Sequence, residues 1–417
     1  MNSKKSVKAM VLFLSIGSSF TYANSNKGNP VIASWVQYTA SGVEVRSVTK
    51  GDCPALKVDD KSIPMKERAK PTKSHNDKVC SASLGEDSKS VVVAGQNLPV
   101  VKQNPEKILI IGDTGCRVSS GHGLYQACNN SSEWPFKRLA ESAASHNPDL
   151  IIYTGDYIYR EAPCPEGNNG CKGTPYGDNL ATWKADWLIP AQPLHLTAPM
   201  ILTRGNHETC KRAGMGWFRY LDARPYDNEC KLNNFPWVAD VGSHDIAVMD
   251  TANLKDESGN ALTKRFENEF IALKGELNKN TWLMTHRPFW GYGADDDDGK
   301  LTVQTEVLQD AVRAVGLPKL TTLLISAHLH LAEIIAFKES ERPPQLIIGN
   351  GGTQLVPDVP EITEIDGEAI LTQRVLNQFG YAMMYKMDEQ AWSIIFYDQS
   401  GHELESCQLT GKELTCQ

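Results

Sequence analysis

The sequence predicts an α/β fold around a largely buried sheet, preceded by a small β-rich region. Two observations lead to this prediction. From residue 106 onward, short segments rich in Val, Ile and Leu alternate with segments whose apolar residues recur at helical spacing. Residues 24–105 are polar in contrast and contain only short β-like runs. Strands that alternate with helices are typical of proteins whose sheet is covered by helices.

The first 23 residues have the pattern of a secretory signal peptide. A basic stretch, MNSKKSVK, precedes the apolar run AMVLFLSIGSSF and a candidate cleavage site at Thr21-Tyr22-Ala23. A retained membrane anchor is the alternative, but an apolar run of about 12 residues is short for a membrane span. We therefore expect a secreted or periplasmic protein with no membrane segment after cleavage.

The composition excludes some classes of partner. The chain of 417 residues has a formal net charge of −8, and 41% hydrophobic and 22% charged residues are ordinary proportions for a soluble globular protein. Loss of the signal peptide leaves 39 basic against 50 acidic side chains, a charge of −11. Such an acidic chain is a poor candidate for nucleic-acid binding. The length allows one large domain, or one large and one small, and the oligomeric state stays open.

Ten cysteines, an even number, predict disulfide bonds in an exported chain. A zinc cluster is a weak alternative because the sequence has no CxxC pair. Free thiols are a second alternative, and sequence does not fix the connectivity. The local spacings favour the pairs Cys53–Cys80, Cys116–Cys128, Cys164–Cys171, Cys210–Cys230 and Cys407–Cys416.

The β-rich region is expected to span residues 24–105, with strands in VIASWVQYT, VEVRSV and SVVVAG. The stretch MKERAKPTKSHNDK between them predicts a charged loop. The main domain is expected to span residues 106–417. Its predicted strands are KILIIGD, DLIIYTGD, MILTRGN, HDIAVMDT, TWLMTH, LTTLLISAH and QLIIGNGG.

Three helices are expected in the main domain. They are PFKRLAESAASHN, a segment with Phe266, Phe270, Leu273 and Leu277 on one face, and LTVQTEVLQDAVRAVG. The tail, YAMMYKMDEQAWSIIFYDQSG, predicts two strands joined by a turn at MDEQ.

Five of the predicted strands end in residues that bind metal ions. These residues are Asp113, Asp156, Asn206 with His207 and Glu208, His286, and His328 with His330. A single Asp or His at a strand end is usually a cap or a loop residue. Five in one domain point to a shared site, because the carboxyl ends of neighbouring parallel strands lie close together.

The residue types indicate which metals to expect. Carboxylates, imidazoles and an amide form a mixed oxygen and nitrogen site for iron, zinc or manganese rather than a thiolate site. There are too many such residues for one ion. Two ions about 3.5–4 Å apart can hold the attacking oxygen and a phosphoryl oxygen during an in-line displacement.

In order, these motifs read GDTG (112–115), GDYIY (155–159), GNHE (205–208), LMTH (283–286) and AHLH (327–330). They resemble the metallophosphoesterase superfamily and, within it, the purple acid phosphatases, whose pattern is GDxG, GDxxY, GNH[DE], VxxH and GHxH. The resemblance covers about residues 106–355 and implies a two-sheet sandwich flanked by helices. Leu283 and Ala327 depart from the pattern, both at positions that are not ligands.

The resemblance bears on the tyrosine of GDYIY. Most relatives outside the purple group have a histidine in the first motif, whereas Asp113 is followed here by Thr114 and Gly115. Tyr159 stands at the tyrosine of GDxxY and is expected to supply the missing ligand. A tyrosine ionises near pH 10 in water, so it binds at acid or neutral pH only beside a strong Lewis acid such as Fe(III). Tyr157 is expected to be a core residue or to lie behind the ligands.

By resemblance, Fe(III) takes Asp113, Asp156, Tyr159 and His330, and a divalent ion (Zn, Fe or Mn) takes Asp156, Asn206, His286 and His328. A metal-bound hydroxide is the implied nucleophile, and His207 the implied general acid or phosphate-positioning group. These roles predict an exported acid phosphatase-like hydrolase of phosphomonoesters, acting on a small phosphorylated substrate. The alternatives are a phosphodiesterase or nucleotide hydrolase with the same site, and a binding protein that keeps only a structural metal centre.

Weaker features allow two readings each. Arg117 and His122 are candidates for phosphate contact or ordinary loop residues. The run Asp295–Asp298 is a solvated loop tip or has a function, as a lid against highly charged substrates or a weak calcium site. Residues 349–352 form a tight turn or bring backbone N–H groups near the metals. The loop RPFWGYGADDDDGK has no histidine, although purple phosphatases often place one there. Four other histidines, His146, His195, His244 and His402, are expected to be structural or exposed.

Overall fold

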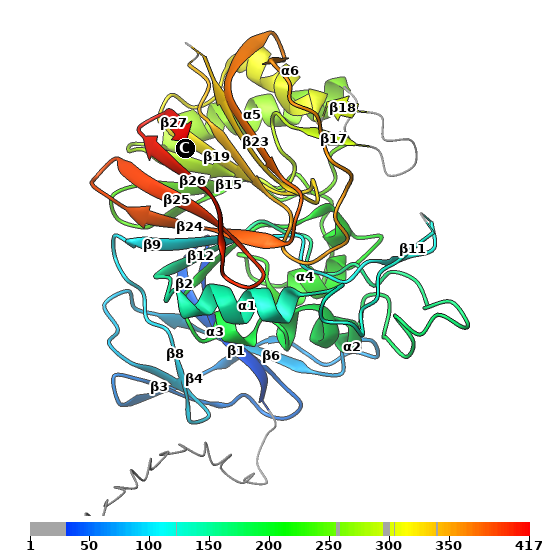
Figure 1. Ribbon diagram of the computed structural model, residues 1–417. Coiled ribbons are helices and arrows are strands. Elements are labelled where there is room, and N and C mark those ends of the chain that lie inside the picture. The colour runs from blue at the N-terminus through cyan, green and yellow to red at the C-terminus, as the bar shows by residue number, and fades with distance from the viewer. Residues whose placement is uncertain (1–30, 122, 256–258, 295–300, 304, 339–340) are drawn as a thin grey trace, which may run out of the picture.

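Two β-sheets packed face to face form the body of the protein (Figure 1). The computed structural model describes residues 31–121, 123–255, 259–294, 301–303, 305–338 and 341–417. The larger sheet has 11 strands in the order β27-β26-β25-β24-β9-β12-β13-β1-β2-β6-β5, and the smaller has 8 in the order β14-β15-β16-β19-β21-β20-β23-β22. The predicted two-sheet α/β fold is confirmed. The predicted signal peptide lies outside the described residues.

The strands of the larger sheet are β1 (Val31–Thr39), β2 (Gly42–Thr49), β5 (Lys66–Ala69), β6 (Lys78–Leu84), β9 (Lys107–Ile111), β12 (Leu150–Tyr153), β13 (Met200–Leu202), β24 (Gly380–Lys386), β25 (Ala391–Asp398), β26 (Glu403–Thr410) and β27 (Glu413–Cys416). Those of the smaller sheet are β14 (Trp237–Asp240), β15 (Asp245–Val248), β16 (Thr281–Met284), β19 (Thr321–Ser326), β20 (Ala332–Phe337), β21 (Gln345–Ile348), β22 (Glu364–Ile365) and β23 (Glu368–Leu376).

Successive apolar side chains of the central strands point to opposite faces of the larger sheet, so both faces carry a hydrophobic core. In β9, Ile108 and Ile110 pack in the cluster between the sheets, and Leu109 and Ile111 pack in the cluster under the helices. The period of two along a strand produces this division. Because both faces are buried, the strand reads as a continuous apolar run in the sequence.

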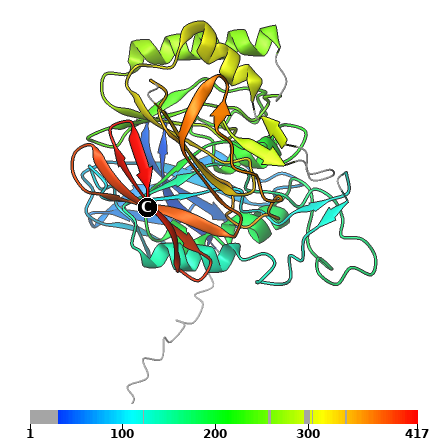
Figure 2. The same ribbon diagram turned by 45° about the horizontal axis from the view of Figure 1, so that its top comes forward.

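Helices cover the two outer faces (Figures 1 and 2). On the larger sheet lie α1 (Phe136–Ser145), α2 (Leu180–Trp183), α3 (Gln192–His195) and α4 (Gly214–Tyr220), with a π-helical turn, η1 (Lys184–Leu188), after α2. On the smaller sheet lie α5 (Asn260–Glu276) and α6 (Glu306–Val315). The third predicted helix began too early, since Leu301–Val303 form strand β18, which pairs with β17 (Tyr292–Ala294).

The N-terminal region is β-rich, as predicted, and its strands extend the larger sheet. β1 runs parallel to β13, with Gln37 opposite Met200, and β2, β6 and β5 follow antiparallel. A separate four-stranded sheet contains β3 (Ala55–Val58), β4 (Lys61–Pro64), β7 (Val91–Val93) and β8 (Gln96–Leu98). The prediction of a loop over MKERAKPTKSHNDK was wrong for β5. Its charged residues are tolerated because β5 is an edge strand. The domain boundary at residue 105 stays a prediction.

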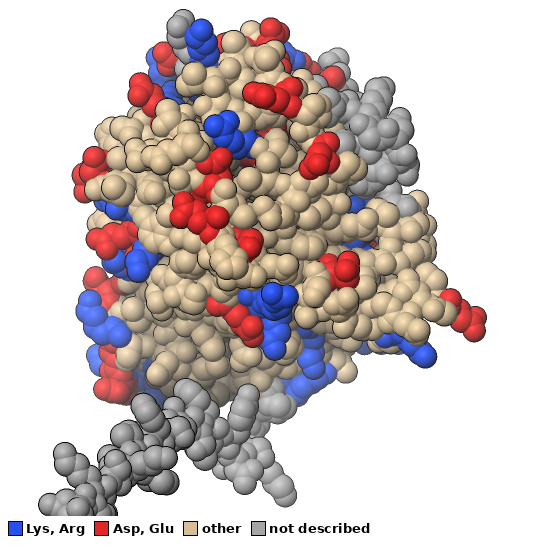
Figure 3. Space-filling model, viewed as in Figure 1, with Lys and Arg blue, Asp and Glu red and all other residues tan. Residues whose placement is uncertain are grey.

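All five predicted disulfides are present, and the described residues include no free cysteine. Basic and acidic side chains are interspersed over the face shown in Figure 3. Among the described residues, no helix is long and apolar enough to cross a membrane.

Candidate metal centre

The predicted site residues converge at one edge of the sandwich. Asp113, Asp156 and Asn206 follow the parallel strands β9, β12 and β13 of the larger sheet. His286 and His328 follow the parallel strands β16 and β19 of the smaller sheet. The carboxyl ends of both sheets therefore supply side chains to a single place, as expected for strands of this direction.

A first group of side chains surrounds the hydroxyl of Tyr159. Its Oη lies 2.6 Å from Oδ2 of Asp156, 3.2 Å from Oδ1 of Asp113 and 2.9 Å from Nε2 of His330. Tyr159 is fully buried, as are both aspartates. The side chain thus points into the site rather than into the core.

A second group shares Asp156 with the first. Nε2 of His286 lies 2.9 Å from Oδ1 of Asn206 and 3.2 Å from Oδ2 of Asp156. Asp156, His286 and His328 each offer a ligand atom within 4.8 Å of the others. One carboxylate therefore touches both groups, which is the arrangement that a bridging ligand needs.

The spacing of these donor atoms fits metal ions. Bonds of about 2.1 Å at right angles place neighbouring ligand atoms about 3 Å apart. The distances within the two groups, 2.6 to 3.2 Å, are of this size. The donors are oxygens and imidazole nitrogens, which suit iron, zinc or manganese.

The backbone is strained where it presents these side chains. Asp113, Asp156 and His328 have φ of 51°, 53° and 71°, in the left-handed region. This region costs roughly 1–2 kcal/mol for a residue with a Cβ. Hydrogen bonds between the loops help to hold the conformation, including His328 N–H to Oδ2 of Asp113 at 2.7 Å. Gly205 has no room for a side chain, because a Cβ there would come 2.0 Å from Oδ1 of Asp156.

His207 lies beside the two groups. Its backbone N–H donates to Oδ1 of Asp156 at 2.8 Å, and its ring lies over that of Tyr159, with centroids 3.8 Å apart. Nδ1 is 2.9 Å from Oε1 of Glu161, an ion-pair distance without hydrogen-bond geometry, and Arg212 Nε is 3.2 Å from the same oxygen. Nε2 is left on the side of Asp156, 4.0 Å from Oδ2.

Burial sets the charge states of the site. It raises the pKa of Tyr159 well above 10, and the carboxylates of Asp113 and Asp156 raise it further. It lowers the pKa of His328 well below 6.5 and that of His330 to about 3, so these imidazoles are neutral, the form that binds metal ions. For Asp156, burial would raise the pKa, but His286 and His207 hold it well below its usual range.

Comparison with known families agrees with this geometry. Residues 106–332 match the model of the calcineurin-like phosphoesterases. The chain belongs to this family. It is therefore a phosphoric ester hydrolase, as predicted. A search of curated protein sequences finds no relative of this phosphoesterase.

The fold is shared by solved structures, among them the following two. Purple acid phosphatase PPD1 from seeds of yellow lupin (Lupinus luteus) has a TM-score of 0.60 at 12% identity, over 92% of this chain and 74% of that one. PhoD has a TM-score of 0.56 at 10% identity, over 94% of this chain and 93% of the other. At these identities the likeness concerns the fold of the phosphoesterase alone.

Of the other features singled out in the sequence, one lies in the core, one approaches the site, and two lie outside the described residues. Tyr157 is a core residue, stacked on Tyr153 at 4.6 Å, with its hydroxyl donating to the carbonyl of Thr203 at 3.0 Å. Residues 349–352 do approach the site, since Gly351 N–H donates to the carbonyl of Gly112 at 3.0 Å and a Cβ at Gly349 would come 2.5 Å from Oδ2 of Asp113. His122 and Asp295–Asp298 lie outside the described residues.

Three residues at the site, Asp186, Glu161 and Arg287, were not predicted from the sequence, and Glu208 was identified only as part of the GNHE motif. Glu208 and Asp186 are fully buried carboxylates that accept hydrogen bonds from backbone N–H groups of the motif loops. Glu161 lies beside His207, and Arg287 lies beside His328. Glu208 belongs to the GNHE motif and Arg287 directly follows the LMTH motif, so their places in the sequence could have indicated a role at the site. Asp186 comes from the π-helical turn, and no motif beside it indicates such a role.

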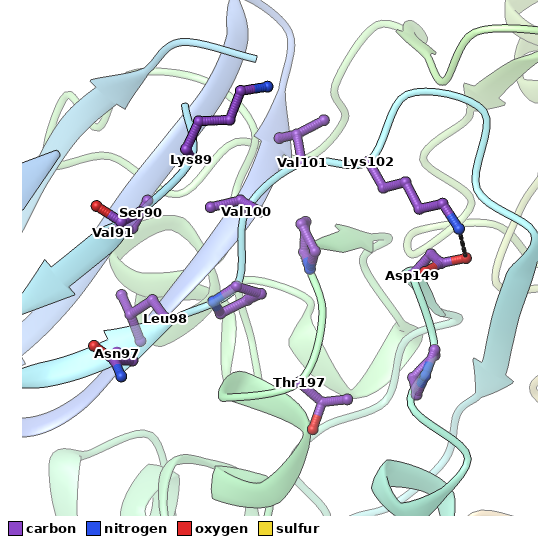
Figure 4. A pocket seen from close by; sticks show the side chains of 13 residues that line it. Lys89, Ser90, Val91, Asn97, Leu98, Val100, Val101, Lys102, Asp149 and Thr197 are labelled. Carbon is purple, nitrogen blue, oxygen red and sulfur yellow. Dashed lines mark hydrogen bonds and ion pairs between the residues drawn. The ribbon is translucent and has the colours of Figure 1, made fainter. Parts of the chain in front are cut away.

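The site is distinct from a pocket on another part of the phosphoesterase. That pocket, of about 670 Å³, lies between the four-stranded sheet and the larger sheet (Figure 4). Lys102 and Asp149 form an ion pair of 3.1 Å at its wall. None of its lining residues belongs to the predicted site or is a His or Cys, so its size does not make it a candidate for the chemistry.

Proposed function

We propose that this phosphoesterase is an exported phosphatase that hydrolyses phosphomonoesters at a dinuclear metal centre. The observation that carries the proposal is the contact of Tyr159 Oη with Asp113, Asp156 and His330. A buried hydroxyl with a raised pKa, set among carboxylates, becomes an anionic ligand only beside a strongly charged cation. This supports Fe(III) in the first position, held by Asp113, Asp156, Tyr159 and His330.

A divalent ion (Zn, Fe or Mn) would be held by Asp156, Asn206, His286 and His328. Nδ1 of His286 lies 2.8 Å from the carbonyl of Thr154, which orients the ring so that Nε2 faces Asp156 and Asn206. Such a pair of ions supplies an activated water and polarises a phosphoryl oxygen.

His207 is the proposed proton donor to the leaving group. It is in the site yet binds neither proposed metal, and its Nε2 is directed toward Asp156. Glu161, itself paired with Arg212, lies beside Nδ1 on the opposite side of the ring, which leaves Nε2 on the side of Asp156. A positioned histidine of this kind typically contributes 100-fold or more to the rate.

Export is supported by the five disulfides, which persist in secreted or periplasmic proteins. N-terminal sequencing of the mature protein tests this part, and we expect the chain to begin near Asn24. Intact residues 1–23 on the exported protein would contradict cleavage.

Metal analysis combined with a phosphoester panel tests the whole proposal. We expect two metal ions per chain, one of them iron, and faster turnover of p-nitrophenyl phosphate than of bis(p-nitrophenyl) phosphate. Faster turnover of the diester would favour the alternative of a phosphodiesterase or nucleotide hydrolase. Bound metal without turnover of either ester would favour a binding protein with a structural metal centre.

A further inference from the structure

Two arginine side chains lie against the histidines of the AHLH motif. Nη1 of Arg287 is 2.9 Å from Nε2 of His328, and Nη1 of Arg117 is 3.5 Å from Nδ1 of His330. Both arginines are largely buried, with 9% and 7% of their surface exposed. Each proposed metal position therefore has a guanidinium group beside a histidine ligand: Arg117 beside His330 and Arg287 beside His328.

The backbone of Arg287 is fixed in the loop that follows strand β16 of the smaller sheet. The residue directly follows His286, its N–H donates to Oγ1 of Thr251 at 3.0 Å, and its carbonyl accepts from Oγ1 of Thr285 at 2.8 Å. The side chain of Arg287 can change rotamer, but these two hydrogen bonds hold its backbone next to the site. It stands in the loop where the sequence has no histidine.

The backbone of Arg117 is fixed by a disulfide-bonded hairpin. Arg117 follows Cys116, which is bonded to Cys128. Its N–H donates to Oε1 of Gln126 at 2.8 Å, and its carbonyl accepts from the N–H of Gln126 at 2.8 Å. The hairpin thus sets the position of this arginine independently of the smaller sheet.

The chemistry of the two contacts points to a ligand. A guanidinium only donates hydrogen bonds. A histidine that binds a metal ion through one ring nitrogen carries hydrogen on the other, so neither nitrogen of that ring can accept from an arginine. The two Nη1 groups that face these rings would then donate to an oxygen acceptor bound beside the metals. In a phosphoesterase the phosphoryl group is such an acceptor, and its oxygens match the paired N–H groups of a guanidinium.

We propose that Arg117 and Arg287 bind the phosphoryl group of the substrate and select phosphomonoesters over diesters. This inference rests on the proposed function. A monoester has three non-bridging oxygens and carries up to two negative charges, whereas a diester has two such oxygens and one charge. Two guanidinium groups therefore stabilise a bound monoester more than a bound diester.

Binding of inorganic phosphate to the metal-loaded protein tests this without relying on turnover. We expect Arg117→Gln and Arg287→Gln each to raise the Kd for phosphate, measured by calorimetry, by about 10- to 100-fold, the effect of losing a charged hydrogen bond. Metal content should stay at the wild-type level. In kinetics, the ratio of kcat/KM for p-nitrophenyl phosphate to that for bis(p-nitrophenyl) phosphate should fall.

Two further variants serve as controls. Arg287→Lys keeps the charge but loses the paired donors, so it should bind phosphate with intermediate affinity. Arg138→Gln removes an exposed arginine on α1 and should leave the affinity unchanged. A Kd within about twofold of wild type in both Arg117→Gln and Arg287→Gln overturns the inference, and so does loss of metal in these variants, which would make the arginines supports of the histidines. A wild-type protein that hydrolyses no phosphoester would instead contradict the proposed function itself.

Discussion

Oε1 of Glu208 accepts a hydrogen bond of 2.8 Å from the backbone N–H of Tyr157. The same oxygen accepts from Ile158 N–H at 3.1 Å, and Oε2 accepts from Asp156 and Gly205, both at 3.1 Å. One buried carboxylate thus joins the GDYIY loop to the GNHE loop. The two loops carry Asp156, Tyr159, Asn206 and His207, so Glu208 fixes the distance between the two halves of the site.

Replacement of Glu208 by Gln should therefore be costly. The amide nitrogen would face two backbone N–H groups, which lose their acceptor in a buried place. Each such group costs about 1–3 kcal/mol, so we expect the free energy of unfolding to fall by about 2–6 kcal/mol. Urea denaturation measures this, and metal content should fall as well. Glu141→Gln, at a half-exposed position on α1, is the control and should change stability by less than about 0.5 kcal/mol. An equally small change in Glu208→Gln would show that the loops hold without the carboxylate.

His207→Ala should keep the metals and lose turnover. The contact of His207 with Asp156 is made through the backbone N–H, which alanine retains. The lost imidazole is the proposed proton donor, so we expect kcat to fall at least about 100-fold. Steady-state kinetics with metal analysis on the same preparation checks both parts. A kcat within about threefold of wild type, or a metal content that falls with activity, would contradict the assigned role.

The sequence was sufficient for the parts of the fold that are coded locally. Continuous apolar runs such as Ile108–Ile111 identified the central strands, and the polar residue after each run identified the site, because parallel strands bring their ends together. Other strands were missed because they lack a local signal. In β23, buried and exposed residues do not alternate clearly. β20 begins at Ala332, two residues after His330, so no turn separates it from the AHLH motif in the sequence.

Contacts between distant residues could not be predicted. Asp186 accepts a hydrogen bond from Tyr159 N–H across 27 residues of chain, and His328 lies beside Arg287 across 41. Nothing in the spacing of such residues indicates that the fold joins them. The residues that support the site were therefore found only in the structure, whereas the residues proposed as ligands were found from their motifs.

His195 should make the protein less stable in acid. Its ring is buried between Trp35 and Trp187, and neither ring nitrogen has a hydrogen-bond partner among the described residues. Burial lowers its pKa to about 3, so the folded protein holds it neutral. Its contribution to stability is complete above the unfolded pKa of about 6.5 and is lost as the pH falls from there toward 3.

At pH 5 this loss amounts to about 2 kcal/mol. His195→Phe keeps an aromatic ring between the tryptophans and cannot be protonated. Relative to wild type, the variant should gain about 2 kcal/mol of unfolding free energy between pH 7 and pH 5. Urea denaturation at the two pH values measures the gain, and the difference between pH values removes any constant effect of packing. Parallel pH dependence of the two proteins would mean that His195 is not the titrating group.

Tyr159→Phe should remove the colour expected of an Fe(III) phenolate. The change deletes only the hydroxyl that contacts Asp113, Asp156 and His330, and the ring keeps its contact with His207. The variant should therefore stay folded but lose the visible charge-transfer band and bind the first metal more weakly. Tyr157→Phe is the matched control, since its hydroxyl meets a backbone carbonyl in the core rather than the site, and it should keep the colour. Visible spectra with iron quantitation on the three proteins separate the outcomes. A wild type that binds no iron and stays colourless after mild oxidation would remove the Fe(III) assignment and leave a phosphoesterase with two divalent ions.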